Sequence, residues 1–428
     1  MQEERGSYVV PAEAGPGRVP AAGLLTVAFG SSVAMWAVGY LGRLPGLEVP
    51  SPVLLLVILA CLPVGGLLLV RRGGGAVADA ATSGAITGVL NLLVLGSFLV
   101  APSWMIWIPG SLLASAALAA GGAVLAGRGR AEPHPPGAWV PRFAWVAVFA
   151  TLLLLGAGGL VTSAEAGLAV EDWPTSFGYN MFLYPFSRMT GGIYYEHAHR
   201  LIGALVGLTT FTLAFTIQRS ETRRPVRWFA WALVAVVVVQ GTLGGLRVTE
   251  RSLALAIGHA VLAQVFFAAL ALLATLTSQA WRDAVAPTRS AAARTDRVLG
   301  ALLLGLLAIQ LALGAAQRHL HELLLVHVVF GVALVAPFAL RLSLRTISLR
   351  GAHPALRRLG VALGLALAVQ VVLGFAAWVA TASVEAGTLP RAFDLVLATA
   401  HQWFGAILLA TAVLRQGWSI RAGVDLRL

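Results

Sequence analysis

Four histidines in the last two-thirds of the chain lie a short way inside the start of long apolar stretches. Each is followed four residues later by a glycine or an alanine, in the segments His199-Arg-Leu-Ile-Gly203, His259-Ala-Val-Leu-Ala263, His327-Val-Val-Phe-Gly331 and His401-Gln-Trp-Phe-Gly405. Residues four apart share a helix face, so each imidazole has a small side chain one turn deeper. An imidazole above an open patch suits a flat macrocycle bound through its metal. The pattern therefore predicts axial ligands for two haems, each held by two helices.

A single histidine in such a stretch is more often a hydrogen-bonded core residue than a ligand. Ionisable groups inside a membrane are costly and usually mark function, and four in matching positions favour ligation. A zinc or copper site is disfavoured, because such sites need ligands closer in sequence or a mixed set with cysteine or carboxylate.

The segment Tyr194-Tyr-Glu-His-Ala-His-Arg200 is the richest in polar chemistry. Glu196 lies three residues before His199 and so shares its face. A carboxylate there could relay protons or orient a substrate, or it could be an acid favoured by the helix N-terminus. Arg200 could pair with a haem propionate or extend to the membrane surface. Three further histidines are expected to be exposed outside the apolar boundary: His197, His319 and His321.

The composition indicates the kind of element that positions these residues. Of 428 residues, 58% are hydrophobic and 11% charged, and the mean hydropathy is +0.83, which excludes a soluble globular protein. A spanning helix needs about 20 apolar residues. Twelve stretches qualify: 21–42, 52–70, 79–101, 104–126, 142–163, 194–217, 226–247, 252–277, 297–317, 321–343, 356–381 and 396–415. We predict an all-α multi-pass membrane protein whose last eight helices form a pseudo-symmetric haem-binding bundle.

The net charge of +12 comes from arginines clustered in alternate loops, not from a patch suited to nucleic acid. The positive-inside rule then places both termini and the arginine-rich loops in the cytoplasm. In that orientation the four histidines lie roughly 8–10 Å below the extracytoplasmic boundary at 1.5 Å per residue. The expected location is the cell (inner) membrane, with the haem sites toward its outer side. The single cysteine, Cys61, can form no internal disulfide.

A linker rich in proline and glycine, residues 127–137, divides the chain. We predict a four-span region at 1–135, for which the sequence suggests no role, and an eight-span region at 136–428 that holds the candidate chemistry. Three helices that precede a histidine helix share a pattern, Gln240-Gly-Thr-Leu-Gly244, Gln310-Leu-Ala-Leu-Gly314 and Gln370-Val-Val-Leu-Gly374. Small residues alone would explain close packing in lipid, but recurrence in register favours duplicated two-helix hairpins.

The motif Glu196-x-x-His199-Arg200, the later histidine helices and the loop Gly167-Leu-Ala-Val-Glu-Asp-Trp-Pro174 together resemble the heme A synthase family over roughly residues 140–428. That resemblance implies oxidation of a methyl group of heme O to the formyl group of heme A, for terminal oxidase assembly. It implies Glu196 as the catalytic acid. The implied site residues are, for the substrate haem, His199, His259, Arg200 and Gly203, and for a haem b that relays electrons, His327, His401, Gly331 and Gly405.

The chain departs from that pattern where many bacterial members carry a cysteine pair, since Val170 and Ser176 stand at those positions. The implied cofactor is haem b, the substrate is heme O, and the oxygen source is molecular oxygen or water. Expected partners are the lipid bilayer, a heme O synthase and an electron donor that the sequence does not identify. No nucleic acid is expected, and a homo-oligomer stays open. Two alternatives from the residues alone are a di-haem b electron-transfer cytochrome and a haem transporter or chaperone.

Overall fold

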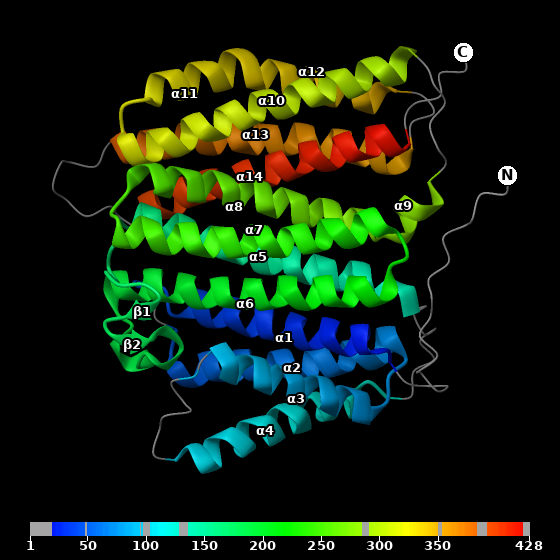
Figure 1. The fold of residues 1–428 in the computed structure, drawn as a ribbon, viewed down its shortest axis with the longest axis vertical. Helices are drawn as coiled ribbons and strands as arrows, with labels where there is room; N and C mark the ends of the chain where they lie inside the picture. Colours follow the sequence, from blue (N-terminus) through cyan, green and yellow to red (C-terminus); the bar gives the residue numbers. More distant parts are fainter. Residues whose placement is uncertain are drawn as a thin grey trace. The chain divides into compact units, whose positions relative to one another are not determined.

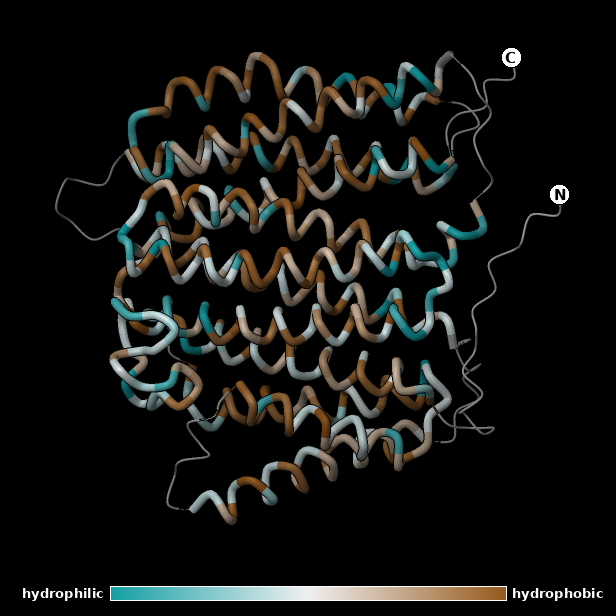
Figure 2. The backbone as a smooth tube through the Cα atoms, viewed as in Figure 1, coloured by the Kyte–Doolittle hydropathy of each residue, from teal (hydrophilic) through white to brown (hydrophobic). Residues whose placement is uncertain are grey.

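The computed structural model describes residues 19–47, 49–94, 96, 103–127, 136–284, 291–349, 353–382 and 392–422. In this part of the chain, twelve helices are long and apolar enough to cross a membrane, and the strands are confined to one short hairpin. The predicted all-α multi-pass membrane protein is confirmed. The helices are mainly hydrophobic along their length, with hydrophilic residues gathered toward their ends (Figure 2).

The chain divides into two compact units. The first comprises Met1–Leu154 and Ala169–Ala235, and the second comprises Leu155–Leu168 and Val236–Leu428. The predicted division into residues 1–135 and 136–428 stays a prediction, because residues 128–135 of its linker lie outside the described part of the chain.

The first unit contains α1(Ala21–Gly42), α2(Ser51–Gly73), α3(Val77–Val94), α4(Trp104–Leu125), the start of α5(Trp139–Ser163), α6(Gly191–Ser220) and the start of α7(Arg224–Thr249) (Figure 1). The third span was predicted to reach residue 101. Helix α3 is described as far as Val94, and residues 95 and 97–101 lie outside the described part of the chain. Glycines bring α2 and α4 together: a Cβ on Gly66 would collide with the Ala119 carbonyl, and one on Gly122 with the Pro63 carbonyl. Close backbone approach of this kind is a main source of helix association in lipid.

Helix α1 packs against α6 within this unit. The Tyr194 hydroxyl donates to the backbone carbonyl of Tyr40 at 2.6 Å, and the two rings stack with their centres 5.6 Å apart. The N-terminal spans therefore support the helix that carries Glu196, a role that the sequence did not suggest.

The second unit contains the rest of α5 and α7, then α8(Leu253–Leu276), α9(Gln279–Asp283), α10(Ala291–Leu320), α11(Leu324–Phe330), α12(Ala336–Ser348), α13(Pro354–Ala382) and α14(Ala392–Arg421). The short helix α9 was not predicted. At one end of the unit, Arg415 is fully buried and forms an ion pair with Asp296. Ser419 donates to the same carboxylate at 2.6 Å, and Arg415 Nε donates to Thr346 at 3.1 Å. This cluster connects α10, α12 and α14.

The tenth span is not one regular helix. A π-helical turn, Gly331–Val335, separates α11 from α12. Such turns hold one residue more than an α-helical turn and often occur at functional sites. Here the turn begins four residues after His327, at one of the predicted patch glycines.

The segment between α5 and α6 has structure that the sequence did not predict. Strands β1(Thr175–Ser176) and β2(Tyr179–Asn180) form an antiparallel hairpin. Two single 3₁₀ turns, Met181–Leu183 and Phe186–Arg188, then lead into α6.

Candidate functional site

Glu196 is a buried carboxylate in the first turns of α6, with 2% of its surface exposed. It accepts a hydrogen bond from the Val170 amide at 2.9 Å and an ion-paired one from Arg200 at 2.7 Å. Charge-assisted hydrogen bonds are among the stronger polar contacts in proteins. Glu196 and His199 both belong to α6, three residues apart. The sequence did not reveal the two donors to Glu196.

Arg200 joins α6 to the preceding loop. Its guanidinium donates to the backbone carbonyls of Val170 at 2.7 Å, Asp172 at 2.6 Å and Thr175 at 3.1 Å, in addition to Glu196. Arginine suits this task because its planar donors form a fixed fork. The sequence suggested that Arg200 pairs with a haem propionate or extends to the membrane surface. In the structure its guanidinium instead donates to three carbonyls of the loop.

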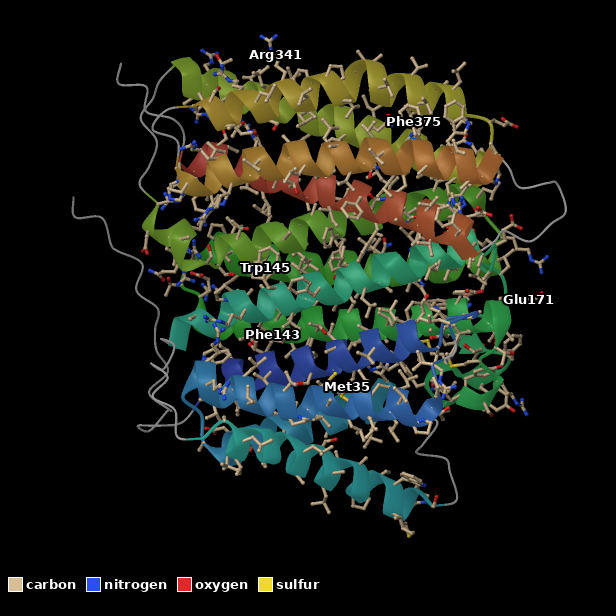
Figure 3. All side chains as sticks on the ribbon, turned by 180° about the vertical axis from the view of Figure 1, so that it is seen from behind. Met35, Phe143, Trp145, Glu171, Arg341 and Phe375 are labelled. Carbon is tan, nitrogen blue, oxygen red and sulfur yellow. The ribbon has the colours of Figure 1, made fainter. Side chains whose placement is uncertain are left out.

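The loop itself is held by Asp172. Its carboxylate accepts from the amides of Phe177 at 2.7 Å and Gly178 at 2.8 Å, both of which have positive φ angles (51° and 77°). Partial burial acts to raise the pKa of Asp172, but hydrogen bonds from the Gly178 amide, the Thr175 side chain and the Phe177 amide outweigh it, so the pKa is lowered. The neighbouring acid, Glu171, is exposed (Figure 3).

His197 is buried, with 1% of its surface exposed, so its expected exposure was wrong. Its Nδ1 lies 3.1 Å from the Ser176 hydroxyl, and its ring centre is 4.9 Å from that of Tyr184. A position beyond the apolar boundary would face water on an isolated helix, but here the loop folds over the start of α6 and covers His197. His319 is half-buried, and His321 is exposed as expected.

The predicted residues for the substrate haem are divided between the two units. His199, Arg200 and Gly203 belong to the first unit, and His259 belongs to the second. His199 and His259 are both half-buried. A Cβ added to Gly203 would meet Leu154 at 3.9 Å, an ordinary contact, so this glycine is not enclosed within its unit. The pairing of His199 with His259 stays a prediction.

His327 of α11 and His401 of α14 come together in the second unit. Their ring centres are 6.2 Å apart and their planes are nearly perpendicular, at 88°. His327 is the fourth residue of α11 and His401 the tenth of α14. The two rings thus meet although they lie at different distances from the first described residues of their helices. The predicted depth of the histidines in the membrane stays a prediction.

Both rings line a cavity of about 610 Å³ formed by α8, α10, α11, the π-helical turn, α13 and α14. Its lining includes the predicted Gly331 and Gly405, and among residues not predicted as site residues Gln310, Gln370, Arg318, Trp378 and Phe375. Phe375 projects from α13 (Figure 3). In the sequence, the two glutamines belong to the repeated Gln-x-x-x-Gly pattern, and no pattern there points to Arg318.

The cavity fits a haem held by two imidazoles. Nitrogen ligands lie about 2.0 Å from a transition-metal ion, which puts the centres of two opposed imidazoles on one ion roughly 6 Å apart. The observed 6.2 Å agrees. In the described residues, no cluster of three or more His, Cys, Asp or Glu side chains could hold a metal ion. Two imidazoles suffice where a porphyrin supplies the other four ligands, and Arg318 on the lining could pair with a propionate.

Comparison with known proteins identifies a similar family and a similar protein. Residues 141–331 match the family model COX15-CtaA, described as cytochrome oxidase assembly protein. This part of the chain is therefore similar to that family. The match contains Glu196, His199, His259 and His327, whereas His401 lies beyond it.

A curated relative, "Heme A synthase" of Sphingopyxis alaskensis, is 26% identical over 208 residues, which cover 42% of this chain and 58% of that protein. The chain thus spans little more than half of the relative's length. No solved structure matches the chain.

Proposed function

We propose that the chain is a heme A synthase of the cell membrane, with both termini in the cytoplasm. It would oxidise a methyl group of heme O to the formyl group of heme A, with molecular oxygen or water as the oxygen source. The family match to a cytochrome oxidase assembly protein and the similarity to a protein named heme A synthase support this proposal.

The observation that carries the proposal is the buried Glu196 beside His199. The residues three positions before the other three histidines are apolar: Ala256, Leu324 and Ala398. A pure electron-transfer cytochrome has no use for an acid at one histidine alone. As a carboxylate on the His199 face, Glu196 can accept a proton from a bound substrate or orient it. Arg200 holds the carboxylate in place.

The second unit would support that reaction by electron transfer. His327 and His401 are the residues that would hold a haem b, and such a group supplies one-electron chemistry when bound. The neutral amides of Gln310 and Gln370 and the apolar side chains of Phe375 and Trp378 line the same cavity. These surroundings suit a permanently held group.

The test uses full-length protein produced with a source of heme O, followed by extraction and chromatography of its haems. The wild-type chain should yield heme A. Glu196→Gln keeps the size and polarity of the side chain but removes the exchangeable acid, so it should keep haem b and accumulate heme O or a hydroxylated intermediate. Glu171→Gln, which alters an exposed acid of the adjoining loop, is the matched control and should still give heme A.

The electron-transfer alternative predicts a different pattern. Glu196→Gln would then shift the haem potential slightly and leave the extracted haems unchanged. A wild-type chain that yields haem b alone, with heme O supplied, would count against the synthase.

A further inference from the structure

The glycines of the three Gln-x-x-x-Gly segments have one shared contact in the structure. A Cβ placed on Gly244, Gly314 or Gly374 would lie 2.9 Å from Cε1 and 3.3 Å from Nδ1 of His259, His327 or His401 respectively. The same two distances recur in three separate helix pairs, α7 with α8, α10 with α11 and α13 with α14. The Nδ1–Cε1 edge of each imidazole thus packs against the backbone of a glycine. Any residue with a side chain at that glycine position would displace the imidazole.

In the first two pairs, the glutamine one turn earlier contacts the same histidine. Gln240 donates its side-chain amide to the His259 carbonyl at 2.7 Å, while His259 Nδ1 lies 3.1 Å from the Gln240 carbonyl. In the second pair, the Gln310 amide donates to the His327 carbonyl at 3.1 Å and lies 3.2 Å from its Nδ1.

The Gln240–His259 pair fixes which ring nitrogen carries the proton. A backbone carbonyl can only accept, so Nδ1 of His259 must be the donor and Nε2 keeps its lone pair. Partners of this kind, one shell away from a metal, set the tautomer and orientation of histidine ligands.

The glutamines have a second feature in common. The side-chain oxygens of Gln240, Gln310 and Gln370 are buried and have no hydrogen-bond partner among the described residues. Buried polar atoms in native proteins are normally satisfied. Three equivalent exceptions beside three histidines indicate that these side chains are retained for the histidines and not for packing alone.

We infer that Gln240/Gly244, Gln310/Gly314 and Gln370/Gly374 are positioning pairs that seat the imidazoles of His259, His327 and His401 for haem iron, and that the first pair leaves Nε2 of His259 free to bind it. The inference rests on the proposed function for the identity of the bound group. It adds what none of the family comparisons assigns: a reason for the repeated motif.

Glycine substitutions test the pairs, since the chain provides matched controls. Gly314→Ala and Gly374→Ala place a methyl group against the ring. Gly305→Ala on α10 and Gly241→Ala on α7 place it in open space. Full-length variants are purified, and haem per polypeptide, the low-spin absorption spectrum and the electron paramagnetic resonance g-values are measured, with circular dichroism as the check on folding.

Loss of partners in this shell costs about 10- to 100-fold in metal affinity, so Gly314→Ala and Gly374→Ala should lose haem to that extent or shift the g-values. Gly305→Ala and Gly241→Ala should match the wild type. Gln310→Met keeps the side-chain length but removes the amide, and it should move the g-values while the protein stays folded. If Gly314→Ala and Gly374→Ala match Gly305→Ala in haem content and g-values, the positioning pairs are refuted.

A wild-type chain without low-spin haem would refute the haem assignment and leave the pairs to be judged by themselves. Nitrogen-15 resonances of the haem-free protein then decide, because His259 should carry its proton on Nδ1 in the wild type. In Gly244→Ala that preference should be lost, and in Gly241→Ala it should be kept. A proton on Nε2 of wild-type His259 would overturn the inference.

Discussion

The surroundings of His199 differ from those of the other three histidines. His199 follows a buried acid that is ion-paired with Arg200 and tied to a folded loop. His259, His327 and His401 instead rest on glycines, and neutral glutamine amides accompany them. One type of side chain thus occurs in two kinds of environment. A charged, loop-covered environment suits chemistry on a molecule that enters and leaves, and the close-fitting one shared by His327 and His401 suits a group that stays. His259, the predicted partner of His199 at the substrate haem, has the close-fitting kind.

The largest expected effect separates the permanent site from the rest. His327→Ala or His401→Ala should remove most of the low-spin b-type absorption, because each leaves a single imidazole where two are needed for a six-coordinate iron. Absorption spectra of the purified variants measure this. His353→Ala, whose ring stacks on Trp418, should keep the full spectrum. If both His327→Ala and His401→Ala kept the full absorption, these two histidines would not be the ligands of a permanently held haem.

Arg200→Leu should have the next largest effect. It leaves Glu196 buried without its partner and releases three loop carbonyls, and breaking a buried ion pair costs about 3–5 kcal/mol. Arg200→Lys keeps the charge but not the fork of donors, so its effect should be intermediate. Thermal unfolding and amide exchange of residues 169–190 measure both. Equal loop protection in all three proteins would show that Arg200 does not hold the loop.

Asp172→Asn should act on the loop alone, with a dependence on pH. The pKa of Asp172 is lowered in the folded loop, so its stabilisation is complete above the unfolded pKa, about 3.9. That stabilisation is lost as the pH falls through the lowered value. The partly exposed carboxylate should contribute below about 1 kcal/mol. Amide exchange at Phe177 and Gly178 should therefore be faster in the variant at neutral pH and equal to wild type in strong acid. A difference that persists in acid would exclude the charge as its cause.

The smallest effect is expected at Gly203. Its added methyl group would meet Leu154 at 3.9 Å, so Gly203→Ala should leave thermal stability unchanged or raise it by up to about 1 kcal/mol. Retention of heme O by the folded variant then tests the predicted patch directly. Unchanged retention would show that the macrocycle does not lie against this glycine.

The spans could be predicted because hydrophobic length is a local property, and α1 was placed at its observed bounds. The histidine helices and the face shared by Glu196 and His199 followed from helical period in the same way. The burial of His197 and the role of Arg200 could not be predicted, because both depend on a loop that folds back over α6. The Gln-x-x-x-Gly repeat was visible in the sequence, but its meaning required the partner helix.

The π-helical turn at Gly331–Val335 has a consequence for how α11 and α12 can vary. Removing one residue from a helix rotates everything beyond it by about 100°. Before the turn, His327 must face His401. After it, Ser343 donates to the Gly360 carbonyl at 2.8 Å and Thr346 accepts from Arg415. The extra residue of the π-helical turn sets the rotation of α12 about the helix axis relative to α11, so that both sets of contacts can form. Deleting one residue of this turn would rotate either α11 or α12 away from the helices that it contacts. The contacts of His327, or those of Ser343 and Thr346, would then be lost although all three residues remain in the sequence.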